Sequence, residues 1–277
     1  MFSSFQALKD WVYAEFLRAP IVKPTHWQGR LVKDKPEMET YELLNHSSTL
    51  WLPDEDLDDY RKDIQPDLPW ADDHFEERVC GYPLNPGTQW AKWRLGKGAD
   101  DFRDSDGRFN HNYMERFWPK FARMVPPSTE PHPEWLKGLH PHRGIHYEYG
   151  DLRDVVKLLH REPQTRQAFL PMFFPEDTGA VHKDRTPCSL GWQFILRDEK
   201  LHCTYFLRSV DVINHWPNDI YFAVRMVLWM LQELRKMDKS WEEINPGTLT
   251  THITSFHCFK ATYHHIGDYH ESTKSQA

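Results

Sequence analysis

The stretch 186–221, TPCSLGWQFILRDEKLHCTYFLRSVDVINHWPNDIY, decides the fold. Two runs of alternating apolar and polar residues flank the polar loop 197–200, and this pattern predicts two adjacent strands. The following segment, 220–235, repeats apolar residues at helical spacing and predicts a long amphipathic helix. Catalytic groups are therefore expected at the ends of these strands: a thiol, a guanidinium and two carboxylates, on Cys188, Arg208, Asp211 and Asp219.

The spacing of these groups resembles that of the thymidylate synthase superfamily. In that family a Pro-Cys nucleophile precedes an Arg-Ser-x-Asp phosphate-binding motif by 20 residues, and a base-reading residue follows 11 further on. Arg208 lies 20 positions after Cys188, and Asp219 lies 11 positions after Arg208. The base reader is Asn where the substrate is dUMP, and Asp in the cytidylate-specific branch. The chain is therefore similar to the deoxycytidylate 5-hydroxymethylase-like branch.

The resemblance implies a fold class as well as a site. We expect an α+β fold of three layers, in which helices pack on a large mixed β-sheet, within a single domain over 1–277. A helix at 3–18 opens the chain, and the loops 94–110 and 125–143 have the composition of insertions. Further helices are predicted at 70–81 and 151–160, and further strands at 39–44, 49–52, 168–174 and 252–259.

Cysteine suits chemistry at C5 of a pyrimidine, which is itself a poor nucleophile. A thiolate that adds to C6 converts the ring to an enamine that is nucleophilic at C5. Arg208 and Arg166 would supply a positive field that favours the thiolate of Cys188. The ordinary alternative for a strand-end cysteine is inert core packing. The resemblance implies that C5 then takes a one-carbon unit from 5,10-methylenetetrahydrofolate.

Four further site residues rest on the resemblance. Glu77 matches the catalytic glutamate that holds water and relays protons, because Tyr113 follows it by the family's 36 residues; Glu76 is the alternative equivalent. Trp90 opens a Trp-x-x-Trp motif, whose first tryptophan lines the folate site in the family; core packing is its alternative. His257 matches a histidine that reaches the sugar hydroxyl.

Two departures from the family pattern concern substrate binding. An Arg-Arg pair in the family reaches across a dimer interface to the neighbour's substrate phosphate. Here Arg166 keeps the first arginine and Gln167 replaces the second, so one charged contact is absent. Phe259 replaces a tyrosine that also reaches the sugar. A homodimer in which Arg166 completes the partner's site remains the expectation.

The remaining roles concern the base and the phosphate loop. Gln193, Ser209 and Asp211 are expected to orient the base and the phosphate-binding loop. Asp219 is expected to accept the N4 amino group of cytosine. A carboxylate there can also cap the following helix, as can Asn218, and capping does not exclude base reading.

Composition and charge exclude several function classes. The net charge of −7 argues against a nucleic-acid polymer as partner, and no apolar run approaches the roughly 20 residues that span a bilayer. The start of the chain lacks the pattern of a signal peptide. Four scattered cysteines lack metal-site spacing and are typical of a reducing cytoplasm, that of the host if the protein is viral. The histidines 140, 142 and 146 lack further ligands, so no metal is expected.

The predicted function is folate-dependent C5 hydroxymethylation of a cytidine monophosphate, dCMP in the first place, giving 5-hydroxymethyl-dCMP. The family seals its folate site with a C-terminal tail. Here 20 residues follow His257, and 271–277 is polar, so water is expected to reach the activated carbon. The alternatives are a dCMP C5-methyltransferase, a CMP hydroxymethylase and a non-catalytic nucleotide-binding relative. A DNA cytosine methyltransferase would need a methyl-donor motif and a basic surface, which the sequence lacks.

Overall fold

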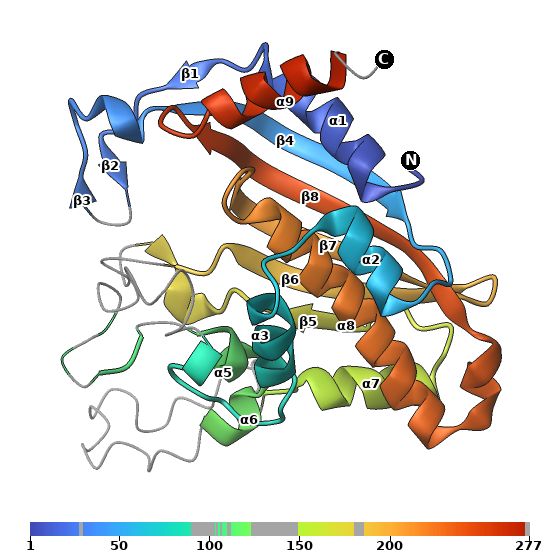
Figure 1. Cartoon of the computed structure of the whole chain (residues 1–277). Coiled ribbons are helices and arrows are strands. Elements are labelled where there is room, and N and C mark those ends of the chain that lie inside the picture. The colour runs from blue at the N-terminus through green and yellow to red at the C-terminus, as the bar shows by residue number, and fades with distance from the viewer. Residues whose placement is uncertain are drawn as a thin grey trace, which may run out of the picture.

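A mixed sheet forms the centre of the computed structural model (Figure 1). The structure describes residues 1–27, 30–89, 112–122, 149–179 and 186–274, with 103, 105 and 107–109. Within these residues six strands lie in the order β1-β4-β8-β7-β6-β5, where β7 and β8 are parallel and the other neighbours antiparallel. Their bounds are β1 Ile21–Val22, β4 Thr40–Trp51, β5 Phe169–Pro171, β6 Ser189–Arg197, β7 Lys200–Asp211 and β8 Asn245–Phe259.

The hairpin of β6 and β7 forms as the alternating pattern predicts. Arg197 pairs with Lys200, and the two residues between them, Asp198 and Glu199, have φ values of 49° and 55°. Two consecutive positive φ values are typical of the tight turn that matches the twist of a hairpin. From Lys200 to Arg208 every second side chain of β7 is buried, Cys203 among them, as expected for a strand with one face toward the core.

Helix α8 (Trp216–Met237) is the central helix of the fold. Positions 220–224 are all buried, and five consecutive residues cover every side of a helix. The helix contacts β7 and β8, and it also contacts α2 (Leu57–Ile64), α3 (Trp70–Arg78) and α7 (Leu152–Arg161). The sheet, α8 and the helices packed on α8 are the expected layers, and the predicted α+β fold with a large mixed sheet is confirmed.

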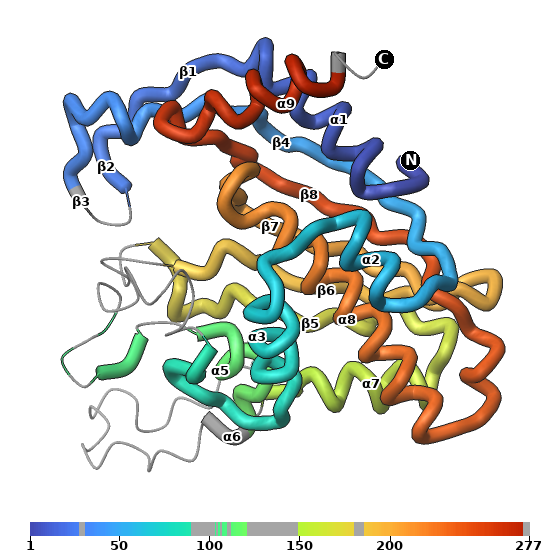
Figure 2. The backbone as a smooth tube through the Cα atoms, in the orientation of Figure 1, coloured from blue at the N-terminus to red at the C-terminus, as the bar shows by residue number. Residues whose placement is uncertain are grey.

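The two ends of the described chain lie together. Helix α1 (Phe5–Phe16) begins after Ser4, whose hydroxyl accepts a hydrogen bond from the backbone N–H of Ala7. Helix α9 (His264–Lys274) lies beside α1 (Figure 2), and the Tyr269 hydroxyl donates to Asp10. The remaining elements are the ribbon β2 His26–Trp27 and β3 Arg30–Leu31, the short helices α5 Tyr113–Phe117 and α6 Pro119–Ala122, and 3₁₀ turns at Pro36–Met38, Pro175–Asp177 and Lys239–Glu243.

Several predicted boundaries are wrong, each for a local reason. The strands expected at 39–44 and 49–52 are one strand, β4, because Asn45 takes a positive φ of 53° and the pairing continues beyond it. The strand expected at 168–174 is the three-residue β5. Helix α8 begins at Trp216 with His215 as its N-cap, so Asn218 and Asp219 lie in its first turn and do not cap it.

Some sequence predictions concern residues that the structure does not describe. The loop 125–143 and most of 94–110 lie outside the described residues, as do the histidines 140, 142 and 146. In the part of the chain that is described, no helix is long and apolar enough to cross a membrane.

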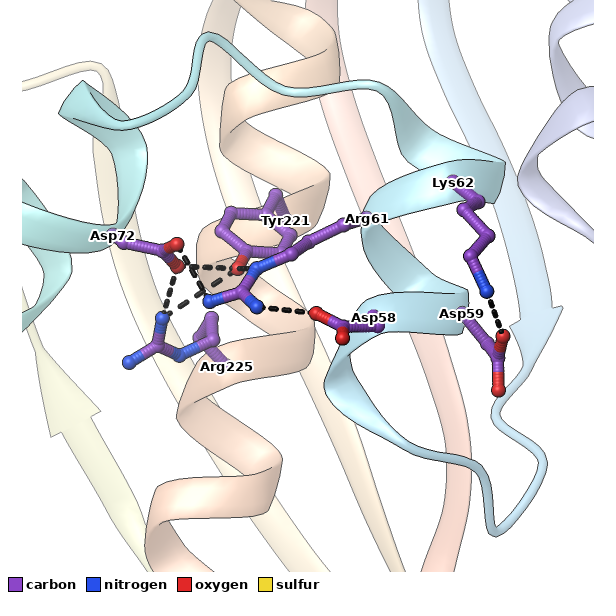
Figure 3. Close-up of polar contacts among 7 residues, drawn as sticks. All are labelled: Asp58, Asp59, Arg61, Lys62, Asp72, Tyr221 and Arg225. Atoms are coloured by element: carbon purple, nitrogen blue, oxygen red, sulfur yellow. Dashed lines mark hydrogen bonds and ion pairs between the residues drawn. The ribbon is translucent and has the colours of Figure 1, made fainter.

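A polar cluster fixes α3 against α8 (Figure 3). Asp72 of α3 accepts hydrogen bonds from Arg61 of α2 at 2.6 Å and from Tyr221 of α8 at 2.5 Å. Arg225 of α8 also donates to Asp72, and its other Nη donates to Glu76. One carboxylate therefore joins three helices, and the position of α3 relative to α8 depends on it.

We expect Asp72→Ala to lower the free energy of unfolding by about 1–3 kcal/mol, because largely buried guanidinium groups lose an acceptor. The matched control is Asp59→Ala, whose partner Lys62 is exposed (Figure 3). That change should cost less than about 0.5 kcal/mol. Urea denaturation of both variants measures the difference, and equal losses would show that the cluster does not hold the helices.

Candidate active site

A cavity of about 490 Å³ lies at the carboxyl ends of the parallel strands β7 and β8. Ser209 pairs with Ser255 in register there, and Asp211 pairs with His257, so polar side chains from both strands meet at one edge. Open sheets commonly bind ligands at this position. The lining includes these residues singled out from the sequence: Tyr113, Cys188, Arg208, Ser209, Asp211, Asp219 and His257.

Arg208 and Tyr113 hold the loop that carries Cys188. The Arg208 guanidinium donates to the carbonyl oxygens of Pro187 and Thr186, both at 2.8 Å, and its backbone N–H donates to the Cys188 carbonyl at 2.9 Å. The Tyr113 hydroxyl accepts from the backbone N–H of Cys188 at 3.2 Å. A guanidinium has five N–H donors, so Arg208 keeps donors for an anion in the cavity after these two bonds.

Asp211 positions the start of α8 and through it Asp219. Its Oδ1 accepts from the backbone N–H groups of Ile213 and Asn214, both at 3.0 Å. This buried carboxylate closes the turn that joins β7 to α8, so its contacts are those of a residue that shapes the loop. Three residues into α8, Asn218 exchanges two hydrogen bonds of 2.9 Å with Asp67.

Asp219 is partly buried and lines the cavity. Burial raises the pKa of this carboxyl to about 7; Arg78 opposes the rise and Asp211 adds to it. A carboxyl with this pKa exists in both protonation states near neutral pH. It can therefore give or take a proton at the reacting ring, as a general acid or base requires.

Arg78 also lines the cavity, although it was not among the residues expected in the site. Its side chain comes from α3 and the residue is 6% exposed. Its guanidinium carbon lies 4.8 Å from the ring centroid of Tyr113 and 4.2 Å from that of Phe222. No motif or spacing in the sequence marks this arginine, because a single arginine at a helix end is ordinarily a surface residue.

Glu77 does not line the cavity, contrary to expectation. Successive helical residues point about 100° apart, so the turn that aims Arg78 at the cavity aims Glu77 elsewhere. Its side chain is 9% exposed, lies 3.4 Å from Nδ1 of His74, and accepts the backbone N–H of Gln89 at 3.1 Å. Burial raises the pKa of Glu77, but the contact with His74 and the hydrogen bond from the Gln89 backbone outweigh it and leave the pKa below its ordinary value.

Gly87 packs directly against this carboxylate. A Cβ atom at Gly87 would lie 2.2 Å from Oε2 of Glu77, so a larger residue there would displace the Glu77 side chain. The alternative, Glu76, is exposed and pairs with Arg225, outside the cavity lining.

Gln193 and Arg166 also lie away from the lining. Gln193 pairs with Thr204 on the sheet face that points away from α8, and its side-chain amide donates to the Arg166 carbonyl at 2.9 Å. Arg166 is exposed beside β5. Trp90 lies outside the described residues, so its position relative to the cavity stays a prediction.

His257 and Phe259 form the far wall of the cavity. Nδ1 of His257 lies 3.4 Å from the Ser209 hydroxyl, and burial lowers the pKa of His257. Phe259 stands edge-on to His257, and further aromatic residues that the sequence did not mark share the lining: Trp27, Trp70 and Phe222. Among the described residues, the exposed side chains of His264, His265 and Asp268 come close enough to share a metal ion, but they lie on α9, away from this cavity.

The comparisons with known proteins all point to one family. The family model for thymidylate synthase matches residues 85–273, which include Cys188, Arg208 and Asp219. Two curated proteins named "Putative thymidylate synthase", from Methanosarcina mazei and Methanosarcina barkeri, are each 25% identical to this chain over 112 and 117 residues. These matches cover 40% and 42% of this chain, and the chain spans about half the length of each relative, 47% and 49%.

The raised pKa of Asp219 makes stability depend on pH. Its pKa in the folded chain lies above the ordinary value of 3.8, so the cost of ionising the buried group grows as pH rises from about 4 to about 7. Asp219→Asn removes this cost. We expect the unfolding free energy of the variant, relative to the wild type, to be higher at pH 8 than at pH 5. Urea denaturation at both pH values measures it, and a difference independent of pH would contradict the assignment.

Proposed function

The chain belongs to the thymidylate synthase family, and from that premise we propose that it transfers a one-carbon unit from 5,10-methylenetetrahydrofolate to C5 of a cytidine monophosphate, with dCMP as the favoured substrate. The observation that carries the proposal is one cavity lined by a thiol, a guanidinium and a partly buried carboxyl, on Cys188, Arg208 and Asp219. Each has a separate task in that reaction.

The phosphate is assigned to Arg208 and Ser209. Arg208 keeps N–H donors beyond the two that hold the Cys188 loop, and the Ser209 hydroxyl lies beside it in the lining. Charged hydrogen bonds of this kind contribute roughly 1.5–3 kcal/mol each. The same arginine therefore binds the nucleotide and holds the nucleophile, which brings C6 of the base toward Cys188.

Cys188 is assigned as the nucleophile. Its thiolate adds to C6, the C5–C6 double-bond pair moves to C4–C5, and the C4–N3 pair moves onto N3. Asp219 in its protonated form gives N3 a proton, which leaves an enamine that is nucleophilic at C5. Bound methylenetetrahydrofolate supplies the one-carbon unit that C5 takes.

The protonation state of Asp219 refines the base preference. An ionised carboxylate accepts a hydrogen bond from the N4 amino group of cytosine. It cannot pair with O4 of uracil, because both groups are acceptors. A protonated carboxyl has one donor and one acceptor, so it can pair with either base. Since the pKa of Asp219 is about 7, selectivity for cytosine should be complete only above that pH.

The lining suits a flat conjugated ring such as that of folate. Trp70 and Phe222 stand edge-to-face with centroids 5.9 Å apart in the cavity wall. Trp70 is fixed in place by a hydrogen bond of 2.8 Å from its indole N–H to the Gln89 carbonyl. Rigid aromatic surfaces of this kind bind planar ligands by stacking. Trp90 is proposed to add a further surface.

The position of α9 supports hydroxymethylation over methylation. The segment 271–274 is the end of α9, and α9 packs on α1. None of the described residues after Phe259 lines the cavity. Water that reaches the methylene on C5 yields the hydroxymethyl product. Asp219 replaces Glu77 as the carboxyl that activates this water, because Asp219 lines the cavity.

A second copy of the chain is the proposed partner. The sheet face opposite α8 carries aromatic groups: Phe169 is 41% exposed and lies 6.3 Å from Phe206, which stacks on His252 at 5.3 Å. An aromatic sheet face of this kind suits a symmetric interface. Arg166 lies at the edge of that face, held through its carbonyl by Gln193, and is proposed to reach the partner's phosphate.

Replacing the nucleophile tests the covalent mechanism. We expect Cys188→Ala to abolish release of tritium from C5 of dCMP, because no thiolate can add to C6. Cys80→Ala, which changes an exposed free cysteine outside the cavity lining, should retain wild-type release. Binding of dCMP with no exchange in the wild type would favour a non-catalytic nucleotide-binding protein.

Product analysis tests the substrate and the fate of the carbon. With dCMP and methylenetetrahydrofolate we expect 5-hydroxymethyl-dCMP in the mass spectrum and no rise in dihydrofolate absorbance. CMP and dUMP, assayed in parallel, should react more slowly. A stoichiometric dihydrofolate signal with 5-methyl-dCMP would instead identify a methyltransferase, and CMP as the better substrate would identify a ribonucleotide enzyme.

The pH dependence of selectivity tests the role of Asp219. We expect the ratio of kcat/KM for dCMP to that for dUMP to rise between pH 6 and pH 8, as the carboxyl loses its proton. Asp219→Asn should favour dUMP and make the ratio independent of pH, because an amide offers one donor and one acceptor at every pH. A wild-type ratio that does not change with pH would rule out base reading by this carboxyl.

A further inference from the structure

Arg78 is a largely buried cation that lines the cavity, where it can bind an anionic ligand. Its Nε donates to Nε2 of His74 at 3.1 Å, while its two Nη groups have no hydrogen-bond acceptor among the described residues. These Nη groups are accessible from the cavity, so an acceptor on a bound ligand can pair with them. The rings of Tyr113 and Phe222 flank the guanidinium and limit its movement.

We propose that Arg78 is a catalytic residue that stabilises the negative charge formed on the pyrimidine ring when the Cys188 thiolate adds to C6. This inference rests on the proposed function, and it assigns a role that the motif 188–219 does not contain. Arg78 also precedes the region 85–273 that the family model matches.

The charge balance of the addition explains why a cation belongs there. The sulfur lone pair forms the S–C6 bond, and the displaced electron pair comes to rest on N3 and, by resonance, on O2 of cytosine. The negative charge of the thiolate thus moves into the ring. A donor-only group beside Asp219 binds that anion more strongly than the neutral ring, so it stabilises the transition state more than the bound substrate.

His74 and Glu77 hold Arg78 in this position. A guanidinium only donates, so Nε2 of His74 accepts and the ring proton is on Nδ1, which lies 3.4 Å from Glu77. Burial, with the charge of Arg78, lowers the pKa of His74 to about 4, which keeps the ring neutral near pH 7. Glu77 is therefore a positioning residue that acts through His74, although it does not reach the cavity.

Tritium release from C5 of dCMP without folate tests the inference, because it requires thiolate addition to C6 and proton exchange at C5 but no one-carbon transfer. We expect Arg78→Gln to lower the release rate at saturating dCMP by about 10²–10³-fold, as for loss of one oxyanion donor. The dissociation constant for dCMP should change by less than about 10-fold, since the phosphate contacts of Arg208 remain. The pH midpoint assigned to Asp219 should move upward, because Arg78 lowers the pKa of that carboxyl.

The matched control is Arg235→Gln, which removes a partly buried guanidinium of α8 that donates to the carbonyls of Trp241 and Ile244, away from α3 and outside the cavity lining. It should lose stability and keep both the release rate at saturation and the pH midpoint. If Arg78→Gln does not fold, Arg78→Lys is the variant that tests the inference. Lysine keeps the positive charge but lacks the planar guanidinium with its paired N–H donors. We expect a loss of about 10-fold or more with an unchanged dissociation constant.

A folded Arg78→Gln or Arg78→Lys protein that releases tritium at the wild-type rate would overturn this inference and leave the proposed function intact. A wild-type protein that releases none from dCMP or dUMP, with or without methylenetetrahydrofolate, would instead overturn the proposed function itself.

Discussion

The site depends on how the first turn of α8 is held. Asp211 closes the turn that precedes this helix, Asn218 ties it to Asp67, and Tyr221 joins it to Asp72 of α3. These contacts place Asp219 at the carboxyl ends of β7 and β8 and bring Arg78 of α3 to the same cavity. The acid–base group and the cation beside it are therefore positioned by one helix junction.

The charged residues that line the cavity have different roles. Arg208 links nucleotide binding to the geometry of the nucleophile, because its guanidinium holds the carbonyls before Cys188 and keeps donors for a phosphate. Asp219 is buried enough to keep a proton near neutral pH, and Arg78 limits how far its pKa rises. A carboxyl that is balanced in this way can exchange protons with a ring whose charge changes during the reaction.

The sequence could predict the part of the site that one hairpin fixes. The two-residue turn between β6 and β7, together with a bulge between Ser189 and Gly191, pairs Ser189 with Leu207, so Cys188 and Arg208 are neighbours. The 20-residue spacing from Cys188 to Arg208 therefore reflects the pairing register of β6 and β7. Gln193 is on the same hairpin but lies outside the cavity lining, on the sheet face away from α8, which the spacing alone did not reveal.

The residues on α3 could not be predicted in this way. Whether Glu77 or Arg78 faces the cavity depends on the rotation of α3, and the rotation is set by contacts of Asp72 with α2 and α8, far apart in sequence. The family spacing from Glu77 to Tyr113 carries no information about that rotation. Helix α9 was likewise missed, because its polar sequence hides the burial of Ile266 and the packing of Tyr269 against Tyr13 of the N-terminal helix.

The covalent step at Cys188 is the central claim, and trapping it is the most direct test. Fluorine at C5 cannot leave as the proton does, so the reaction of 5-fluoro-dCMP should stop with the S–C6 bond formed. With methylenetetrahydrofolate present, peptide mass spectrometry should find the nucleotide attached to the peptide that contains Cys188. An unmodified Cys188 in a protein that still converts dCMP, or a nucleotide attached to Cys80 instead, would contradict the account.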